Sequence, residues 1–479
     1  MKGLSDYKEF LIRRQQSCSN YGFKPLWMPD KLFPFQVALT EWAVKKGRAG
    51  IFADCGMGKT ACQLAWAENV VRHTNKKVLI LTPLAVGPQT VGEGEKFGIE
   101  CVQSRAGKVS SKITVTNYEK LHKFSPNDFI GCVCDESSII KHNTGATQKK
   151  VTRFMNKMPY RLLCTATAAP NDFVELGTSS EALGELSYSE MLTRFFRQRD
   201  NKGQLQEARK QEFARIAVNH FARLSFRVHQ SIGQWRLKYH AVQNFWQWVS
   251  SWARACRMPS DLGFEDRDFI LPTLKEIDHI IKPDSLPEGL LFSIPAFGLK
   301  EEREERKRTI NQRCEFVANL VDHDQSAIVW CHYNPEGKLL TKLIPDAREV
   351  AGATPDDEKE EIYADFLSGK LRVIVSKPKI GAWGLNWQHC AHGVTFASHS
   401  YEQYYQSLRR IYRFGQKNPV RWDVVATEGE RRVIENMRRK ANQADEMFER
   451  MMEHMTSALK IKRKEYKHKT AELPSWIKG

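Results

Sequence analysis

A ten-residue run, IFADCGMGKT at residues 51–60, constrains the fold more than any other part of the chain. Its apolar start predicts a strand, and a helix is expected over 61–71, so that the helix dipole points at whatever the turn between them binds. Glycines let backbone N–H groups approach a phosphate, a lysine reaches its β- and γ-oxygens, and a threonine hydroxyl holds Mg²⁺. The residues that supply these groups are Gly56, Gly58, Lys59 and Thr60. The run therefore predicts a phosphate-binding loop, although Ala53 stands where the GxxxxGK[ST] pattern begins with glycine.

An acidic pair follows a second apolar run. Asp135 and Glu136 come directly after 130–134, which is expected to be a buried strand. Two desolvated carboxylates are unfavourable unless they serve a cation. Beside a phosphate loop that cation is Mg²⁺, which Asp135 would hold partly through water, while Glu136 would polarise the attacking water. A strand-end turn with two solvated acids is the alternative interpretation.

The stretch YRLLCTATAAPND, at residues 160–172, repeats the order of a strand followed by small residues. Its hydroxyl groups, on Thr165 and Thr167, are placed to relay the state of a γ-phosphate to the rest of the protein. A plain Ser/Thr turn explains the same pattern equally well, so both interpretations stay open.

Near the C-terminal end, QSLRRIYRFGQ at residues 406–416 carries two arginines three positions apart. Within a helix expected over 402–412, Arg410 and Arg413 would share one face. Two guanidinium groups suit the charge that builds on a γ-phosphate during its transfer, so they are candidate arginine fingers. A basic helix that binds the backbone phosphates of a nucleic acid is the alternative.

The spacing of apolar runs predicts two α/β lobes. Apolar runs alternate with helical segments, which is typical of parallel sheets covered on both faces. The expected strands are 78–81, 113–116, 130–134 and 160–164 in the first lobe and 327–331, 371–375, 393–397 and 422–426 in the second. The predicted divisions are an N-terminal arm (1–30), a first lobe (31–180), a helical insertion and linker (181–310), a second lobe (311–428) and a basic helical tail (429–479).

The charge of the chain favours a polyanionic partner. Lys and Arg number 73 against 56 Asp and Glu, a formal net charge of +17. Nucleic acid is the commonest partner of such a surface, and a basic surface that binds nothing is the alternative. No apolar run approaches the ~20 residues of a membrane span, and the eleven cysteines form no CxxC pair, which favours reduced thiols in the cytoplasm. Trp248 and Trp252 could stack on bases, but a packed helical core is the favoured interpretation.

The order of these motifs resembles that of superfamily 2 helicases and translocases. The motifs are Gln36, ADCGMGKT, LILTP, DESS, TATAAPN, VIVSKPKIGAWGLN and QSLRRIYRFGQ. More narrowly, ESSIIKHN, TATAAPND and RRIYRFGQ resemble the Swi/Snf-type branch, and FWQWVSSWARACRMPSDLG looks most like helicases carried by bacteriophages. The resemblance covers about 30–430 and implies a P-loop NTPase with two RecA-like lobes that close on ATP and Mg²⁺.

The resemblance also assigns roles to single residues. It implies that Gln36 contacts adenine and that Lys59, Thr60, Asp135 and Glu136 act on the phosphates, the metal and the water. The residues expected to couple the nucleotide to nucleic acid, or to lie near the bound strand, are Thr82, Pro83, Tyr118, Lys379, Gly384 and Asn386. Departures from the Swi/Snf pattern occur at Ser137, Ser138 and Trp383, and they affect coupling more than hydrolysis.

The function expected from sequence is ATP-driven movement along DNA, with translocation on duplex favoured over strand separation. Two alternatives stay open: a nucleotide-gated DNA-binding subunit of a larger nuclease, replication or recombination complex, and an RNA-remodelling helicase. Single-stranded DNA is a possible partner, a membrane is not expected, and the expected compartment is the cytoplasm, that of a bacterial host if a phage encodes the chain.

Overall fold

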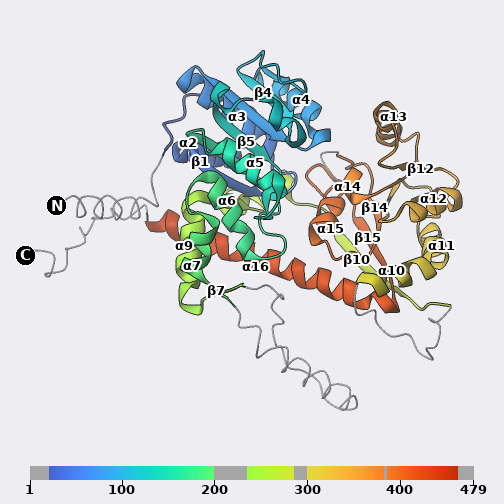
Figure 1. Ribbon diagram of the computed structural model, residues 1–479. Helices are drawn as coiled ribbons and strands as arrows, with labels where there is room; N and C mark the ends of the chain where they lie inside the picture. The colour runs from blue at the N-terminus through green and yellow to red at the C-terminus, as the bar shows by residue number, and fades with distance from the viewer. Residues whose placement is uncertain (1–20, 199–234, 285–298, 382–385, 462–479) are drawn as a thin grey trace, which may run out of the picture.

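The computed structural model describes residues 21–198, 235–284, 299–381 and 386–461. Figure 1 shows two α/β lobes side by side, with the long helix α16 (Arg431–Ile461) running beneath both. Each lobe is built on one sheet, of seven strands in the first lobe and six in the second, and every strand in both sheets is parallel to its neighbours. The expected fold class, two RecA-like parallel-sheet lobes, is confirmed.

The sheet of the first lobe has the strand order β3-β4-β2-β5-β6-β1-β9. Consecutive residues of β1 point to opposite faces, so that Phe52 lies in one buried cluster and Ile51 in the other, as the period of a strand requires. The strands are β1 (Arg48–Ala53), β2 (Lys77–Thr82), β3 (Cys101–Gln103), β4 (Ile113–Asn117), β5 (Phe129–Asp135), β6 (Tyr160–Cys164) and β9 (Ala253–Cys256).

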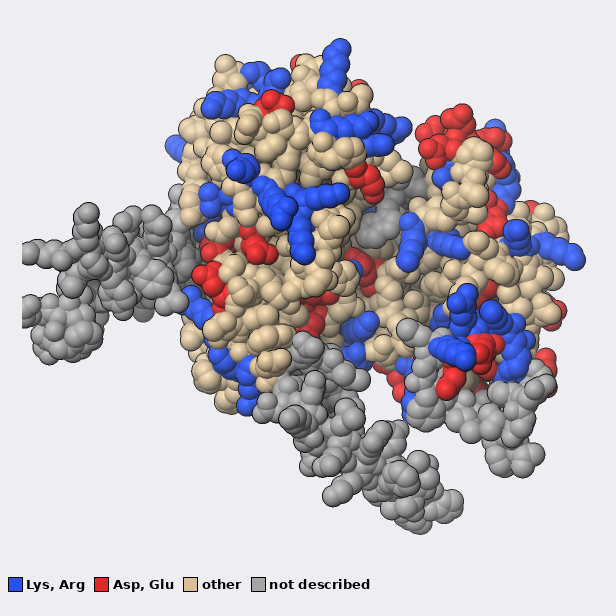
Figure 2. Space-filling view, in the orientation of Figure 1, with Lys and Arg blue, Asp and Glu red and all other residues tan. Residues whose placement is uncertain are grey.

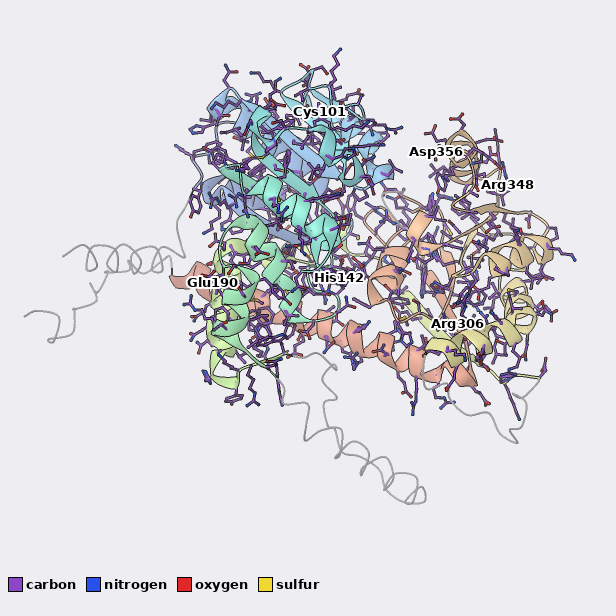
Figure 3. The ribbon with its side chains drawn as sticks, in the orientation of Figure 1. Cys101, His142, Glu190, Arg306, Arg348 and Asp356 are labelled. Atoms are coloured by element: carbon purple, nitrogen blue, oxygen red, sulfur yellow. The ribbon has the colours of Figure 1, made fainter. Side chains whose placement is uncertain are left out.

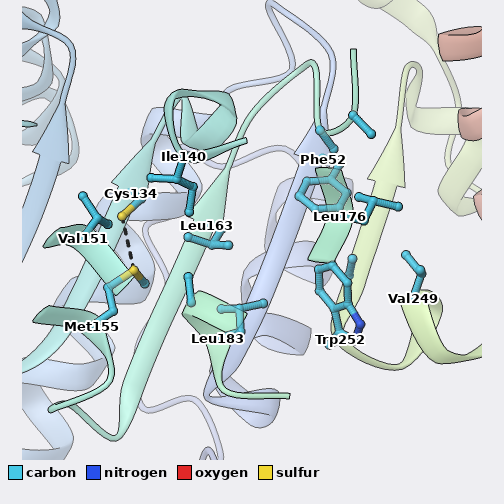
Figure 4. Close-up of a cluster of buried hydrophobic side chains, with 14 of the residues drawn as sticks. Phe52, Cys134, Ile140, Val151, Met155, Leu163, Leu176, Leu183, Val249 and Trp252 are labelled. Carbon is cyan, nitrogen blue, oxygen red and sulfur yellow. Dashed lines mark hydrogen bonds between the residues drawn. The ribbon is translucent and has the colours of Figure 1, made fainter. Parts of the chain in front are cut away.

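Helices cover both faces of this sheet. The face of Ile51 packs against α2 and α3, and the face of Phe52 packs against α5, α6, α7 and α9 (Figure 4). The helices are α2 (Pro34–Lys46), α3 (Lys59–Thr74), α4 (Gly87–Phe97), α5 (Ala146–Met155), α6 (Leu176–Leu183), α7 (Tyr188–Phe195) and α9 (Val242–Trp252). Phe245 and Trp252 are fully buried and Trp248 is 7% exposed, so the packed-core interpretation of this aromatic block is confirmed.

The sheet of the second lobe has the order β10-β15-β14-β11-β13-β12. One face packs against α11 and α12, and the other against α13, α15 and α16. Its strands are β10 (Leu274–Ile281), β11 (Ala327–Trp330), β12 (Ala347–Val350), β13 (Val373–Ser376), β14 (His392–Phe396) and β15 (Val420–Thr427). Its helices are α10 (Leu299–Arg308), α11 (Ile310–Leu320), α12 (Asn334–Leu343), α13 (Asp356–Leu367), α14 (Pro378–Gly381) and α15 (Tyr401–Leu408).

The stretch between the lobes is not purely helical, whereas a helical insertion and linker was expected over 181–310. It contributes β9 to the first sheet, paired with β1, and β10 to the second, paired with β15. A short antiparallel pair, β7 (Phe196–Gln198) with β8 (Trp235–Leu237), also lies here. These strands are stabilised by partners distant in sequence, which a local pattern does not reveal. The domain boundaries themselves stay a prediction.

Helix α16 belongs to the cores of both lobes. Val433 and Met437 lie in a core of the second lobe, whereas Met447 and Met451 lie in a core of the first. The lysine-rich end predicted for the tail falls mostly in 462–479, outside the described residues, as do the first twenty residues of the N-terminal arm. Among the helices that the structure describes, none is both long and apolar enough to cross a membrane.

Candidate nucleotide site between the two lobes

The predicted phosphate loop connects the end of β1 to the start of α3. Gly56 and Gly58 have φ angles of +90° and +77°, in the left-handed region that glycine enters without penalty. A Cβ atom on Gly58 would lie 2.2 Å from Nε2 of Gln36, and one on Gly56 would lie 2.9 Å from the backbone nitrogen of Phe414 in the second lobe. The loop therefore requires glycine at both positions, and the second lobe closes directly over it.

The lysine of the loop is held above the loop backbone. Nζ of Lys59 donates hydrogen bonds to the carbonyl oxygens of Ala53 at 3.0 Å and Asp54 at 3.3 Å. Burial alone would lower the pKa of Lys59, but the neighbouring Cys55 and Glu136 raise it overall, so the ammonium stays charged. A buried cation above a glycine loop at a helix N-terminus is suited to binding phosphate.

Gln36, on α2, makes a hydrogen bond to the same loop. Its Nε2 donates to the carbonyl oxygen of Met57 at 3.1 Å, and its Oε1 accepts from the backbone N–H of Phe33 at 3.0 Å. The side chain is 5% exposed. The structure thus brings Gln36 to the phosphate loop, while its contact with adenine stays a prediction.

The acidic pair ends β5, as expected. Oδ1 of Asp135 accepts from Nε2 of Gln63 at 2.6 Å, and burial together with the adjacent Glu136 raises the pKa of Asp135 to about 6. Glu136 has a φ of +48°, an unfavourable value for a residue other than glycine, of the kind that gathers at functional sites. Its Oε2 accepts from Thr165 at 3.4 Å and, across the cleft, from Nε2 of Gln406 at 3.5 Å.

The two candidate finger arginines do not share a helix face, which corrects the expectation from their spacing. Helix α15 ends at Leu408, and Arg410 and Arg413 lie in the turns that follow. The backbone N–H of Arg410 bonds to the carbonyl oxygen of Ser407, and that of Ile411 to Leu408, so three-residue turns replace the helical pattern. The side chain of Ile411 is fully buried, and packing it in the lobe core redirects the chain.

Both arginines nevertheless reach the cleft. Arg410 is 4% exposed, and its Nη2 donates to Oε1 of Gln406 at 3.1 Å. Burial lowers the pKa of Arg413 to about 10, with a further contribution from Arg410, and Nη1 of Arg413 donates to Oδ1 of Asn386. Gln406, which the sequence did not single out, thereby links Glu136 of one lobe to Arg410 of the other.

An ion pair across the cleft was also not predicted from the sequence. Oδ2 of Asp54, in the phosphate loop, lies 2.6 Å from Nη2 of Arg409, and the hydroxyl of Tyr405 donates to Oδ1 of Asp54. Asp54 is 4% exposed, so this pair is shielded from water. The only signal in the sequence was an acid in the loop and a surplus arginine in the 406–416 stretch.

A second contact between the lobes lies nearby, where Lys141 pairs with Glu402. Figure 3 shows the neighbouring His142 on the side of the first lobe that faces the second. The cleft is thus closed by two ion pairs besides the hydrogen bond between Glu136 and Gln406.

We expect Asp54→Ala to destabilise the closed arrangement, because removing one partner of a buried pair leaves Arg409 uncompensated. Asp54→Ala and Arg409→Ala should each lower the unfolding temperature. The loss of stability in the double variant should be smaller than the sum of the losses in the two single variants. Thermal unfolding of the four proteins gives the coupling, expected at about 0.5–3 kcal/mol. Strictly additive losses would contradict a direct interaction.

The first-lobe residues expected near a bound strand are buried. Thr82 is fully buried and its Oγ1 donates to the carbonyl oxygen of Thr116 at 3.5 Å. The hydroxyl of Tyr118 donates to the carbonyl oxygen of Asp135 at 2.6 Å. Pro83 is buried beside Thr82. These residues therefore support the strand ends around the acidic pair, and their nucleic-acid contacts stay a prediction.

The remaining predicted residues lie in different surroundings. The Oγ1 of Thr165 accepts from the backbone N–H of Thr167 at 3.1 Å, next to Glu136. Lys379 is exposed on α14, and Asn386 contacts Arg413. Gly384 lies outside the described residues.

Several buried polar atoms of the motif residues and their neighbours have no protein partner. A buried polar atom without a partner costs about 1–3 kcal/mol, and a bound ligand can satisfy it. Such side-chain atoms, among the described residues, belong to Gln63, Ser137, Ser138, Thr167, Ser407, Arg409 and Arg413. No group of three metal-ligating side chains is found in the described part of the chain.

Three comparisons show what the chain is similar to. Residues 310–415 match the helicase conserved C-terminal domain. The chain is 22% identical over 425 residues to p41 of Acyrthosiphon pisum secondary endosymbiont phage 1, covering 79% of this chain and 88% of that protein. The SWI2/SNF2 ATPase core of Sulfolobus solfataricus, solved in complex with double-stranded DNA, aligns with 85% of this chain and 90% of its own at 15% identity and a TM-score of 0.38. The helicase resemblance expected from the motifs is confirmed.

Proposed function

Since residues 310–415 match the helicase conserved C-terminal domain, we propose that the chain hydrolyses ATP with Mg²⁺ and uses the energy to move along duplex DNA. The observation that carries the proposal is the meeting, in one closed cleft, of Lys59 and Glu136 from the first lobe with Arg410 and Arg413 from the second. A cleft of this composition suits phosphoryl transfer, where positioning and electrostatic stabilisation supply most of the rate.

Each lobe has a defined share in the proposed reaction. Backbone N–H groups of the loop and Nζ of Lys59 would bind the phosphates, while Thr60 and Asp135 would hold Mg²⁺, whose charge neutralises that of the phosphates. Glu136 would orient and polarise the attacking water. Gln406 would keep Glu136 in place, because its amide bonds to that carboxylate and to Arg410 at once.

Movement would follow from the opening and closing of the cleft. The second lobe touches the phosphate loop through Phe414 and Arg409, so a change at the phosphates changes the contact between the lobes. Helix α16 has residues in both cores and would transmit that change along the molecule. A net charge of +17 supports a polyanionic track, and the motif resemblance to the Swi/Snf-type branch favours duplex over single strands.

The test is the ATPase rate measured with equal concentrations of duplex DNA, single-stranded DNA and RNA, with Lys59→Ala as the blank. We expect stimulation of at least severalfold, chiefly by duplex DNA, because the proposed track is the duplex backbone. A triplex-displacement assay would then measure movement.

Other outcomes would change the proposal in defined ways. Stimulation chiefly by single strands would favour a strand-separating helicase, and preference for RNA would favour a remodelling enzyme. Activity no greater than that of the Lys59→Ala blank under all three conditions would refute an autonomous ATPase and favour a subunit that depends on a partner.

A further inference from the structure

A second cavity lies in the first lobe, outside the nucleotide cleft. It has a volume of ≈ 440 Å³, in the range of small-molecule sites, and it opens between α7 and α9 beside the β7–β8 pair. Figure 1 shows these elements at the lower end of the first lobe, away from α4. The lining residues are Arg194, Phe195, His240, Ala241, Asn244, Gln247, Trp248 and Ser251.

The floor of this cavity is aromatic and one wall offers amides. The rings of Phe195 and Trp248 stack with centroids 5.3 Å apart and are only 3% and 7% exposed, so they close the bottom of the cavity. Asn244 and Gln247 lie three residues apart on α9, hence on one face, and both are exposed. Side-chain amides both donate and accept hydrogen bonds, which matches the edge of a nucleobase.

Basic side chains lie in and beside the cavity. Arg194 and His240 line it. In the neighbouring β7–β8 pair, Arg197 is the direct cross-strand partner of Arg236, and both are exposed. Like charges directly opposite one another destabilise a strand pair, and an anion bound between them would relieve that repulsion. None of the three arginines forms an ion pair with a carboxylate that the structure describes. Figure 2 shows Lys and Arg side chains at the lower edge of the first lobe.

The tyrosine that follows β8 is almost completely solvent-exposed. Tyr239 has 96% of its surface accessible, the highest value among the exposed large apolar side chains described. An exposed ring next to a basic rim is typical of surfaces on which the bases of a single strand stack. An exposed ring, amides and arginines together fit a nucleotide better than an acidic peptide, which offers no planar base for the ring of Tyr239.

We propose that this cavity binds an unpaired nucleotide of DNA, with the base between the exposed ring of Tyr239 and the amides of α9 and the backbone phosphates on Arg197 and Arg236 of the adjacent strand pair. The proposal rests on the proposed function on DNA and deepens it. A continuous duplex presents no free base, so the site would let the protein recognise a gap, a fork or a single-stranded tail next to the duplex on which it moves.

The test compares two DNAs by fluorescence anisotropy: a blunt duplex and the same duplex with a short single-stranded tail. The wild-type protein should bind the tailed DNA about tenfold more tightly, since each stacked or edge-bonded base contributes on the order of a tenfold preference. Asn244→Ala combined with Gln247→Ala should remove the preference and leave affinity for the blunt duplex unchanged. Arg197→Ala combined with Arg236→Ala should weaken binding of the tailed DNA most.

The charge-matched control is Lys338→Ala with Lys370→Ala, two exposed lysines of the second lobe, which should keep the preference. Photocrosslinking of a 4-thiothymidine in the tail should label α9 or Tyr239. A preference retained in the Asn244 and Gln247 double variant, or crosslinks confined to other elements, overturns the proposal. If blunt duplex stimulates the ATPase of the wild type but the protein shows no preference for the tailed DNA, only this inference fails. If no DNA binds to the protein or stimulates its ATPase, the proposed function fails as well.

Discussion

Replacing Glu136 with glutamine should lower ATP turnover by about 10²- to 10⁴-fold, the usual contribution of a general base. Glutamine keeps the size of the side chain and one acceptor oxygen for Thr165 and Gln406, so the cleft should stay closed. It cannot polarise water, because it carries no charge. Nucleotide affinity should stay within severalfold of the wild type. Single-turnover hydrolysis and fluorescent-nucleotide binding measure the two quantities separately.

The matched control is Glu175→Gln, the same chemical change at another buried glutamate of the first lobe. Burial raises the pKa of Glu175 to about 7, while hydrogen bonds from Asn171 act in the opposite direction. This side chain is therefore often protonated already at neutral pH, and the neutral amide loses at most one of the two hydrogen bonds from Asn171. Ordinary turnover in Glu136→Gln, or an equal loss in Glu175→Gln, would remove the role assigned to Glu136.

The features that sequence predicted well are those that local chemistry determines. The expected strand at 160–164 coincides with β6, and the loop ending at Thr60 follows β1 directly, because apolar runs and glycine turns act over a few residues. The acidic pair was placed correctly for the same reason, at the end of β5. Such signals need no knowledge of distant partners.

What sequence missed depends on contacts between distant segments. Strands β9 and β10 are short or at a sheet edge and are fixed by β1 and β15, which lie far away along the chain. Asp54 meets Arg409 across 355 positions, and Glu136 meets Gln406 across 270. The arginine spacing also misled, because helix α15 ends at Leu408, before Arg410. Tertiary packing overrode a local periodicity.

Removing Arg413 should have the larger effect of the two site changes. We expect Arg413→Ala to reduce DNA-stimulated hydrolysis by about 10³- to 10⁵-fold, the contribution of an arginine finger, while DNA affinity changes less than severalfold. Arg413 is half-buried, its Nε is buried without a partner among the described atoms, and its Cβ lies beside Gly56 of the phosphate loop. Hydrolysis rates and DNA anisotropy, measured on the same preparation, provide the comparison.

Two companion variants separate catalysis from support of the fold. Arg413→Lys keeps the charge but loses the planar fork, so it should recover only part of the rate. Asn386→Ala removes the amide that Nη1 of Arg413 contacts, and it should uncouple DNA stimulation while sparing basal hydrolysis. Equal loss of DNA binding and hydrolysis in Arg413→Ala would instead favour a phosphate-backbone contact. Because Cβ of Arg413 lies beside Gly56 of the phosphate loop, we favour the finger over that contact.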